Sequence, residues 1–433
     1  MARIVLSTFG SLGDLHPYLA LGCALRSRGH EVTLASHGTY RARVEASGLA
    51  FAPVRPDLEA FGDLDTAMRA AMHPTRGSVV VLRDLVLPHL RDSAADLWAA
   101  TEGADLLVDH ALAFASPLVA ERRGIPRVST VLQPLTTFPT HTGAVFPGFP
   151  SALLQWLGPW AWRAFWATGR AVMHPWFTEL RALRHEWGLA TAQGHPLIDQ
   201  ASHDLHLVLF SRVLMPPQPD WSSVTVQTGF PWYDRGEAGE GMPQALTHWL
   251  DAGEPPIVFT LGSSAVFTAD RFYDHAAAAA RTLGRRAVLL TGIEDRNPVA
   301  GVPDLAVATT SDAIVRVPYA PHSEVMPRAC AVVHQGGIGT TAQALRAGRP
   351  TLVVPFSHDQ PDNAMRVTRL GVGRTLARPR VSTAAFVREL GALLADPAVA
   401  ARAREVADVV RHESGADGAA DAIERLLAAR RAR

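Results

Sequence analysis

The chain has 433 residues, of which 48% are hydrophobic and 19% are charged, and its formal net charge is zero. This length allows for two domains, and the composition excludes a disordered chain. A neutral net charge gives no sign of a polyanionic partner such as nucleic acid.

Neither the cysteines nor the N-terminus points to secretion. The two cysteines, Cys23 and Cys330, fall in expected elements of different domains, so no disulfide framework is predicted. The first apolar run is short and reaches a glycine turn, as a first strand does and a signal peptide does not. No run approaches the roughly 18 apolar residues that a membrane-spanning helix requires. We therefore expect a cytoplasmic protein.

The chain opens with the pattern of a strand–helix–strand unit. A short apolar run, a glycine-containing turn, a helix and a second apolar run follow one another. Such a unit predicts a parallel sheet, whose ligands bind at the carboxyl ends of the strands. The turn lacks the Gly-x-Gly-x-x-Gly fingerprint of dinucleotide-binding proteins, which argues against a dehydrogenase. The elements are expected at residues 4–8, 9–14, 16–28 and 31–35.

Two aspartates fall at the rim of this expected sheet. Asp14 ends the first turn, and Asp109 follows a short buried strand predicted at residues 106–108. Each aspartate suits catalysis and also suits the N-cap of a helix, and the two roles can coexist. His16 and His110 lie beside them as further candidate bases, although a structural role is the commoner one for each.

Aromatic residues gather between residues 133 and 190. Residues 133–150 contain four prolines and are expected to form a loop, and residues 151–190 hold six of the ten tryptophans. The pairs Trp156/Trp160 and Trp162/Trp166 have the i,i+4 spacing that places each pair on one helix face. Most tryptophans at this spacing belong to a core. A cluster of this size also suits the wall of an apolar ligand site or a membrane-surface face.

The second half of the chain opens in the same way as the first. After a proline-rich segment, a strand that begins at Ile257 ends in a Gly-Ser-Ser turn, where Ser263 and Ser264 are candidate phosphate or sugar contacts. Two similar domains, each begun by a strand, a small-residue turn and a helix, are therefore expected. The last helices are predicted at residues 383–395 and 399–433.

The most informative stretch runs from residue 319 to residue 363. A buried strand predicted at residues 329–333 leads into His334-x-Gly-Gly-x-Gly-Thr-Thr, and a second buried strand leads to Asp359 and Gln360. Glycines let backbone N–H groups approach a phosphate, and a helix N-terminus adds a favourable dipole. Imidazole and hydroxyl groups donate to phosphate oxygens, whereas a carboxylate and an amide suit sugar hydroxyls. A glycine turn that served packing alone would not require this set of polar groups.

Together these features resemble the nucleotide-diphosphosugar glycosyltransferases of the GT-B fold, which have two Rossmann-like parallel-sheet domains facing a central cleft. Residues 319–322, Tyr-Ala-Pro-His, are similar to the Trp-Ala-Pro-Gln motif of the plant enzymes. Residues 10–14, Gly-Ser-Leu-Gly-Asp, are similar to a Gly-[Ser/Thr]-x-Gly-Asp pattern of the sterol, glycopeptide and rhamnolipid-type members. The resemblance covers both halves of the chain and is closest in motif to the rhamnosyltransferases that make rhamnolipids.

The resemblance implies a role for each residue of the donor site. Tyr319 would stack on the nucleobase, His334 would contact the diphosphate, and Asp359 with Gln360 would bind the sugar hydroxyls. Gln343 stands where the plant enzymes have a ribose-binding Glu, which is a departure from the family pattern. The whole predicted donor site comprises Ser263, Ser264, Tyr319, His322, His334, Gly336, Gly337, Gly339, Thr340, Thr341, Gln343, Asp359 and Gln360.

In the first half, the resemblance implies that Asp14 is the catalytic base, where other members place a histidine. Those members orient the histidine with an aspartate at the position of Asp109. In this chain the carboxylates of Asp14 and Asp109 would therefore meet, so that the pKa of one of them would rise or the two would share a proton. The Asp-x-Asp at residues 63–65 is similar to a metal motif of another glycosyltransferase fold but lies in a polar helical stretch. Neither a metal nor another cofactor is predicted. The predicted acceptor contacts are Ser11, His16, His110, Phe138, Phe146 and Trp160.

We therefore expect an inverting glycosyltransferase that moves a sugar, either a deoxyhexose such as rhamnose or glucose, from a nucleoside diphosphosugar. The acceptor would be a hydroxyl or carboxyl group of a lipophilic small molecule or lipid, with transient membrane contact left open. The alternatives are a sugar-nucleotide epimerase of similar fold and an inactive nucleotide-sugar-binding homologue. The expected domains are residues 1–215, a linker at 216–242, residues 243–415, and a helix at 416–433 that packs back on the first domain.

Overall fold

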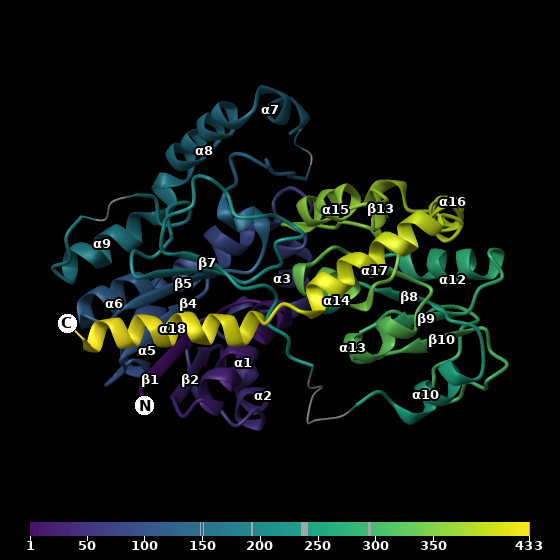
Figure 1. The fold of residues 1–433 in the computed structure, drawn as a ribbon, viewed down its shortest axis with the longest axis horizontal. Helices are drawn as coiled ribbons and strands as arrows, with labels where there is room; N and C mark the ends of the chain where they lie inside the picture. The colour runs from purple at the N-terminus through teal and green to yellow at the C-terminus, as the bar shows by residue number, and fades with distance from the viewer. Residues whose placement is uncertain (148, 150, 192–193, 235–240, 293–295, 433) are drawn as a thin grey trace. The chain divides into compact units, whose positions relative to one another are not determined.

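The computed structural model describes residues 1–147, 149, 151–191, 194–234, 241–292 and 296–432, and it divides into two compact units (Figure 1). Unit 1 comprises Met1–Ala71, Arg76–Tyr233 and Glu413–Arg433, and unit 2 comprises Met72–Thr75 and Asp234–His412. Each unit holds one parallel sheet, so the predicted class of two parallel-sheet α/β domains is confirmed. Residues 235–240 of the expected linker lie outside the described residues.

Unit 1 is built on a seven-stranded sheet in the order β3-β2-β1-β4-β5-β6-β7. The central strands are short apolar runs buried on both faces, as a parallel sheet covered by helices requires. The strand order reverses between β1 and β4, where Ser7 lies opposite Asp109. Ligands of such sheets bind at this switch point. The strands are β1 Arg3–Ser7, β2 Glu31–Ser36, β3 Ala50–Pro53, β4 Leu106–Asp109, β5 Arg127–Val131, β6 Leu205–Val208 and β7 Thr225–Gln227.

Unit 2 repeats this plan with six strands in the order β10-β9-β8-β11-β12-β13. Its switch point lies between β8 and β11, where Thr260 pairs with His334. The chain therefore leaves the carboxyl ends of both strands into the two turns that the sequence marks with glycine and serine. The strands are β8 Ile257–Thr260, β9 Ala287–Leu290, β10 Ile314–Val317, β11 Ala331–His334, β12 Thr351–Val353 and β13 Gly373–Thr375.

Helices pack against strands of both sheets. Among the described helices, none has the length and apolar character needed to cross a membrane. Those of unit 1 are α1 Leu12–Ser27, α2 Arg41–Ala46, α3 Leu64–Ala71, α4 Gly77–Val79, α5 Leu90–Ala100, α6 Ser116–Arg123, α7 Ala152–Leu157, α8 Pro159–Met173, α9 Thr178–Glu186 and α18 Gly415–Arg431. Those of unit 2 are α10 Gln244–Asp251, α11 Gly262–Ala265, α12 Phe272–Thr282, α13 His322–Val325, α14 Ile338–Ala347, α15 Gln360–Arg369, α16 Thr383–Leu394 and α17 Pro397–Arg411.

The C-terminal helix α18 lies along α1 within unit 1 (Figure 1). Arg28, at the end of α1, binds the carboxylates of Asp417 at 3.1 Å and Glu424 at 2.9 Å, and that of Asp421. The single helix predicted for residues 399–433 is wrong, because α17 ends at Arg411 and α18 begins at Gly415. A Cβ at Gly415 would lie 2.3 Å from the backbone of Phe230, so this close approach fixes the break.

The tryptophan-rich segment forms α7 and α8 and only partly follows the prediction. Gly158 separates the two helices with a φ of 83°, so Trp156 and Trp160 lie on different helices and do not share one face. Trp162 and Trp166 do share the buried face of α8, with ring centroids 6.1 Å apart. Trp162 is 1% exposed and Trp156 is 81% exposed, so one tryptophan is core and the other is surface.

Truncation of these two tryptophans should therefore have very different effects. Trp162→Ala leaves a large cavity and should lower the free energy of unfolding of unit 1 by about 3–5 kcal/mol. Trp156→Ala, the matched control, should change it by less than about 0.5 kcal/mol. Urea unfolding of both variants is the measurement. Equal losses from the two substitutions would contradict this division of the segment.

Candidate functional site

The first turn of α1 holds Asp14 at the switch point of the unit 1 sheet. The helix begins at Leu12, earlier than predicted, with Ser11 as the N-cap and Asp14 at the third helical position. The Asp14 carboxylate accepts hydrogen bonds from the Ser11 backbone N–H at 2.8 Å and from the Ser11 hydroxyl at 3.1 Å. A Cβ at Gly10, where φ is 134°, would lie 2.3 Å from this carboxylate. Glycine is thus required beside Asp14, and Asp14 itself is the partner of the cap.

His110 faces Asp14 from the end of β4. Its Nε2 lies 3.5 Å from Asp14 Oδ1, and its Nδ1 accepts a hydrogen bond from the Leu112 N–H at 3.3 Å. Because Nδ1 is an acceptor, the neutral ring carries its proton on Nε2, on the side of Asp14. Burial lowers the pKa of His110, with the Asp14 charge acting in the opposite direction. The arrangement is therefore a carboxylate beside a neutral imidazole donor.

Asp109 does not meet Asp14 as the sequence suggested. Both of its carboxylate oxygens lie 3.1 Å from Arg127 Nε on the neighbouring strand β5. Burial raises the pKa of Asp109 to about 6, and Arg127 opposes this rise. The backbone oxygen of Asp109 accepts from Thr130, whose hydroxyl lies 2.5 Å from the buried Tyr18 hydroxyl. The partner of Asp14 is consequently His110, and Asp109 belongs to the framework behind them.

The predicted acceptor residues do not form a single wall. The Phe138 and Phe146 rings lie 5.0 and 5.7 Å, centroid to centroid, from that of Trp166, and both are partly buried against a small core cluster. Trp160 is 63% exposed. His16 lies elsewhere, with its ring centroid 5.4 Å from that of Tyr233.

Sequence reasoning missed a different apolar pocket, of about 30 Å³, at the carboxyl end of β1. Thr8 and Phe9, in the turn that leads to Asp14, form one side of it. Much of the other side comes from a π-helix at Val80–Val86 and the residues after it. The apolar run at residues 79–82 was the available signal, but periodicity alone does not place a helix over the sheet edge. The apolar side chains of the lining are Phe9, Val54, Val86, Leu90, Leu97, Leu112 and Phe114.

In unit 2, the turn between β11 and α14 builds a set of donors around His334. Gly336 has a φ of 92°, and a Cβ there would lie 2.8 Å from Val353. The Gly336 N–H donates to His334 Nδ1 at 2.9 Å, so the ring proton sits on Nε2. His334 is fully buried, and its Nε2 has no hydrogen-bond partner among the described residues. Burial lowers the pKa of His334 to about 3, so the ring is a neutral donor.

Two neighbouring turns close around this donor set. Gly262, with Ser263 and Ser264 in α11, approaches the Gln335 side chain so closely that a Cβ would lie 2.3 Å from its amide nitrogen. The Gln335 amide donates to the Thr340 hydroxyl at 3.4 Å, and the buried Thr341 hydroxyl has no partner among the described residues. The structure thus brings Ser263, Ser264, His334, the glycines and both threonines to one edge of the sheet.

Asp359 and Gln360 follow β12 at the same edge of the sheet. Asn363, which was not predicted as a site residue, links Asp359 to the glycine turn after β11. Asn363 Nδ2 donates to Asp359 Oδ2 at 2.7 Å and to the Gly336 carbonyl at 2.8 Å. Gln360 Oε1 accepts from the N–H groups of Phe356 and Ser357 at 2.8 and 3.1 Å, so part of this side chain shapes its own turn. The i,i+4 spacing of Asp359 and Asn363 was the signal for this link.

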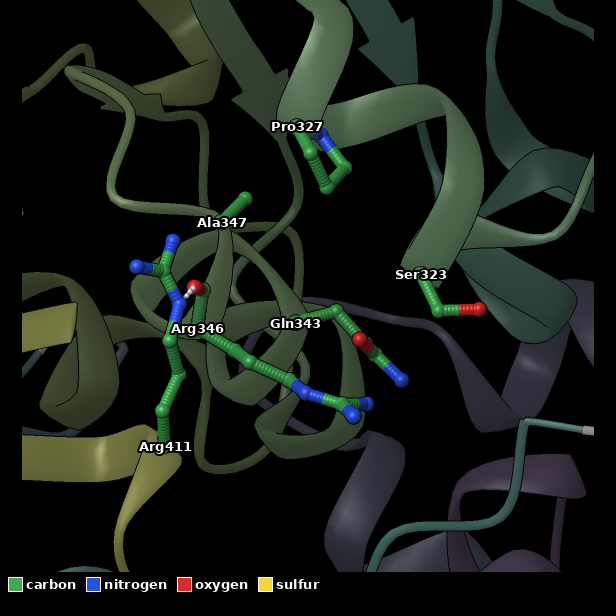
Figure 2. Close-up of a pocket in the computed structure, with 6 residues that line it drawn as sticks. All are labelled: Ser323, Pro327, Gln343, Arg346, Ala347 and Arg411. Carbon is green, nitrogen blue, oxygen red and sulfur yellow. Dashed lines mark hydrogen bonds between the residues drawn. The ribbon is translucent and has the colours of Figure 1, made fainter. Parts of the chain in front are cut away.

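The remaining predicted donor residues surround the start of α13 and the second turn of α14. Tyr319 is 51% exposed, as a stacking platform for a base requires, whereas burial lowers the pKa of His322 to about 4. Gln343 lines a cavity of about 260 Å³ together with Arg346 of the same helix (Figure 2). Ser323, Pro327, Ala347 and Arg411 complete the lining.

The hydrogen-bond donors described at this edge of unit 2 are neutral groups. Backbone N–H groups at a helix N-terminus, a neutral imidazole N–H and hydroxyl groups are the groups that hold a phosphate through hydrogen bonds and the helix dipole. Unit 1 offers an oriented carboxylate, a kind of group that can act as a general base.

Comparison with known proteins agrees with this geometry. Residues 4–137 match the family described as Glycosyltransferase family 28 N-terminal domain, and residues 297–425 match Erythromycin biosynthesis protein CIII-like, C-terminal domain. The chain is 34% identical to O-mycaminosyltylonolide 6-deoxyallosyltransferase of Streptomyces fradiae, over 98% of this chain and 97% of that protein. This chain is a GT-B glycosyltransferase. The resemblance seen in the sequence is thus confirmed.

Two further comparisons extend this result. The glycosyltransferase is 29% identical to sterol 3-beta-glucosyltransferase of Cryptococcus neoformans over 98% of its own length, but it spans only 27% of that relative. Its fold matches the crystal structure of glycosyltransferase VinC in complex with dTDP, with a TM-score of 0.68 and 20% identity, over 98% of this chain and 99% of that one.

Unit 2 of the glycosyltransferase should lose stability in acid. Burial lowers the pKa of His322 to about 4 and of His334 to about 3, whereas an unfolded histidine titrates near pH 6.5. Between these values the unfolded chain binds more protons, so stability that is present above pH 6.5 is lost as the pH falls. Each histidine contributes a slope of about 1.4 kcal/mol per pH unit in that window.

Urea unfolding of the wild type and of His322→Gln at pH 7.5, 5.5 and 4.5 measures this slope. Each protein is compared with its own stability at pH 7.5, which removes the direct cost of the substitution. The wild type should lose more stability than the variant on acidification. Equal losses would contradict the buried, neutral state of His322.

Proposed function

We propose that this glycosyltransferase transfers a sugar from a nucleoside diphosphosugar to a hydroxyl group of a macrolide- or sterol-like acceptor, with inversion at the anomeric carbon. The observation that carries the proposal is the buried Nε2–H of His334 at the N-terminus of α14. A buried donor without an acceptor is costly, and a diphosphate held at a helix N-terminus supplies the acceptor.

For the donor we favour a dTDP-linked deoxyhexose. The relative from Streptomyces is named a 6-deoxyallosyltransferase, and VinC was crystallised with dTDP. The sterol relative is named a glucosyltransferase, so UDP-glucose is the second candidate. Tyr319 would stack on the base in either case, and Asp359 with Gln360 would contact the sugar hydroxyls.

In the proposed reaction Asp14 removes the proton of the acceptor hydroxyl. The acceptor oxygen forms a bond to the anomeric carbon while the bond from that carbon to the diphosphate breaks on the opposite face. Asp14 keeps the proton, and the nucleoside diphosphate leaves with the electron pair. The capping bonds from Ser11 and the Nε2–H of His110 hold the carboxylate in one orientation. Preorganised groups of this kind are effective because they need no rearrangement during the reaction.

Neutral donors would stabilise the departing diphosphate. The Nε2–H of His334, the backbone N–H groups of the glycine turn and the hydroxyls of Thr340 and Thr341 all lie at the N-terminal end of α14. We propose that this set performs the reaction without a metal ion or another cofactor. The helix dipole adds to it, because the charge grows where the partial positive end of α14 lies.

At about 30 Å³, the apolar pocket at the end of β1 has room for one small apolar group of the acceptor, such as a methyl, and we assign it to such a group. Its lining of Phe9, Leu90 and Phe114 joins the turn that carries Asp14. Phe138 and Phe146 would then act by shaping the neighbouring core. The alternatives of a silent nucleotide-sugar-binding protein and an epimerase are not favoured, because the named relatives are transferases and Asp14 is held as a base should be.

Asp14→Asn tests the proposal directly. The substitution keeps the size of the side chain but removes the base, so turnover of an alcohol acceptor should fall by about 10²–10⁴-fold. The measurement is product formation by the purified protein from dTDP-deoxyhexose or UDP-glucose and a panel of macrolide and sterol acceptors. Affinity for dTDP should be unchanged.

The control for Asp14→Asn is Asp63→Asn, which removes a carboxylate that caps α3 by accepting from the Thr66 N–H at 2.8 Å. It should retain wild-type turnover. Retention of full activity by Asp14→Asn would exclude Asp14 as the base. Absence of product from the wild type with every donor would count against the transferase reaction itself.

A second prediction concerns His334 in the turn between β11 and α14. His334→Ala removes one hydrogen bond to a charged phosphate and should weaken dTDP binding about ten- to a hundredfold. His248→Ala, at an exposed position of α10, is the control and should bind as the wild type does. Isothermal titration calorimetry measures both affinities.

Turnover should also persist in excess EDTA, and its complete loss, restored by a divalent ion, would overturn the metal-free mechanism.

A further inference from the structure

The outward face of α8 is apolar, although the exposed face of a surface helix is usually polar. Residues three and four positions apart lie on one face of a helix, and the exposed residues of α8 follow this spacing. Arg163 carries the one charge among them, and Thr168 is the one neutral polar residue. The others are apolar: Trp160, Ala164, Ala167, Ala171 and Val172.

Helix α7 extends this apolar surface. It packs against α8, and Figure 1 shows both helices at the margin of unit 1, away from its sheet. Leu153 and Trp156 of α7 are 61% and 81% exposed. Among the described residues, nine large apolar side chains are exposed, and five of them fall between residues 149 and 172. Single exposed apolar side chains are common, but a cluster of them marks an interaction surface.

We call the exposed residues of these two helices the tryptophan patch; its main members are Leu153, Trp156, Trp160, Arg163 and Val172.

The charge around the tryptophan patch has one sign. The sequence has no aspartate or glutamate from residue 122 to residue 178. The second arginine of α8, Arg170, is bound to Asp199 at 2.6 Å. Arg163 has no hydrogen-bond or ion-pair partner among the described residues. The patch therefore presents an apolar surface with one available guanidinium and without a carboxylate of its own segment.

This combination fits an anionic lipid surface. Indole rings are favoured at the boundary between acyl chains and headgroups, and a guanidinium beside them reaches the lipid phosphates. A second copy of the chain fits less well. In a two-fold dimer the same patch would face itself, so a second Arg163 would arrive and no carboxylate of this segment would accompany it. An unpaired charge buried in such an interface is costly.

We propose that the tryptophan patch docks reversibly on the surface of an anionic lipid bilayer. The side chains of Leu153, Trp156 and Trp160 enter the boundary of the acyl chains, and Arg163 binds lipid phosphates. This inference stands apart from the proposed reaction, because docking requires neither the donor nor the acceptor. Docking holds the protein at the phase in which lipophilic molecules collect.

Co-sedimentation of the full chain with lipid vesicles tests the proposal. One set of vesicles contains equal amounts of phosphatidylcholine and phosphatidylglycerol, and the other contains phosphatidylcholine alone. The wild type should bind the anionic vesicles at least about fivefold more tightly, since one arginine near such a surface is worth about this factor. Trp156→Gln/Trp160→Gln should weaken binding to the anionic vesicles by about tenfold or more, because two indole rings no longer leave water.

Arg163→Gln separates the charge from the apolar contact. It should weaken binding to the anionic vesicles by about fivefold and leave binding to the neutral vesicles unchanged. The matched control is Arg271→Gln, which removes an exposed arginine at the start of α12. Val307→Gln is the control for the tryptophans, because Val307 is 75% exposed in unit 2. Both controls should bind vesicles as the wild type does.

Urea unfolding should give each of these variants the stability of the wild type to within about 0.5 kcal/mol, since every substituted side chain is exposed. A loss of vesicle binding is then a property of the surface and not of misfolding. Trp156→Gln alone serves as the test if the double variant unfolds.

Several results would overturn the proposal. One is failure of the wild type to sediment with the anionic vesicles, and another is equal binding to both kinds of vesicle. Undiminished binding by Trp156→Gln/Trp160→Gln would place the lipid contact elsewhere. A wild-type dimer in size-exclusion chromatography that this double variant dissociates would show that a second copy covers the patch. Normal vesicle binding by the double variant together with loss of turnover would assign the patch to the acceptor.

Discussion

The hydrogen bond from the Gly336 N–H to His334 Nδ1 is the interaction on which the proposed donor site of this glycosyltransferase depends. It exists because Gly336 adopts a left-handed backbone conformation that a side chain would prevent by collision with Val353. The bond fixes the imidazole proton on Nε2, and burial keeps the ring neutral. A cationic histidine would attract any anion at long range, whereas a neutral, buried one acts only on a group that reaches hydrogen-bonding distance. The proposed donor site would therefore select its ligand by the fit of hydrogen-bonding groups and not by net charge.

In unit 1 the fixed group is a hydrogen-bond acceptor instead of a donor, and neutral groups hold it in place. Backbone and hydroxyl groups at the start of α1 hold the Asp14 carboxylate, and His110 faces it as a neutral donor. The guanidinium of Arg127 is bound to Asp109 instead. Because Arg127 is engaged there, it does not neutralise Asp14, which suits the base role that we propose for Asp14. Asp109 contributes by holding Arg127 and, through its backbone oxygen, Thr130.

Contacts between residues far apart in the sequence also fix the positions of polar side chains at these sites. Asn363 joins the turns after β11 and β12, and Asp234 joins the start of unit 2 to α14. Each uses a side-chain amide or guanidinium whose donors are directed at fixed acceptors. Such contacts place a polar group to within a fraction of an ångström, which is the accuracy that ligand discrimination requires. The elements of regular structure alone would leave these groups free to move.

The sequence by itself determined the parallel-sheet fold and the ends of the strands where Asp14 and His334 lie. It could do so because short buried runs, glycine turns and helix starts are local patterns, and because parallel strands deliver their ends to one edge. Only the tertiary structure decided that Asp109 pairs with Arg127, that Asp14 faces His110, and that Trp156 is exposed while Trp162 is core. These outcomes depend on which side chains meet after strands and helices pack, and residues far apart in the chain leave no local pattern for such meetings.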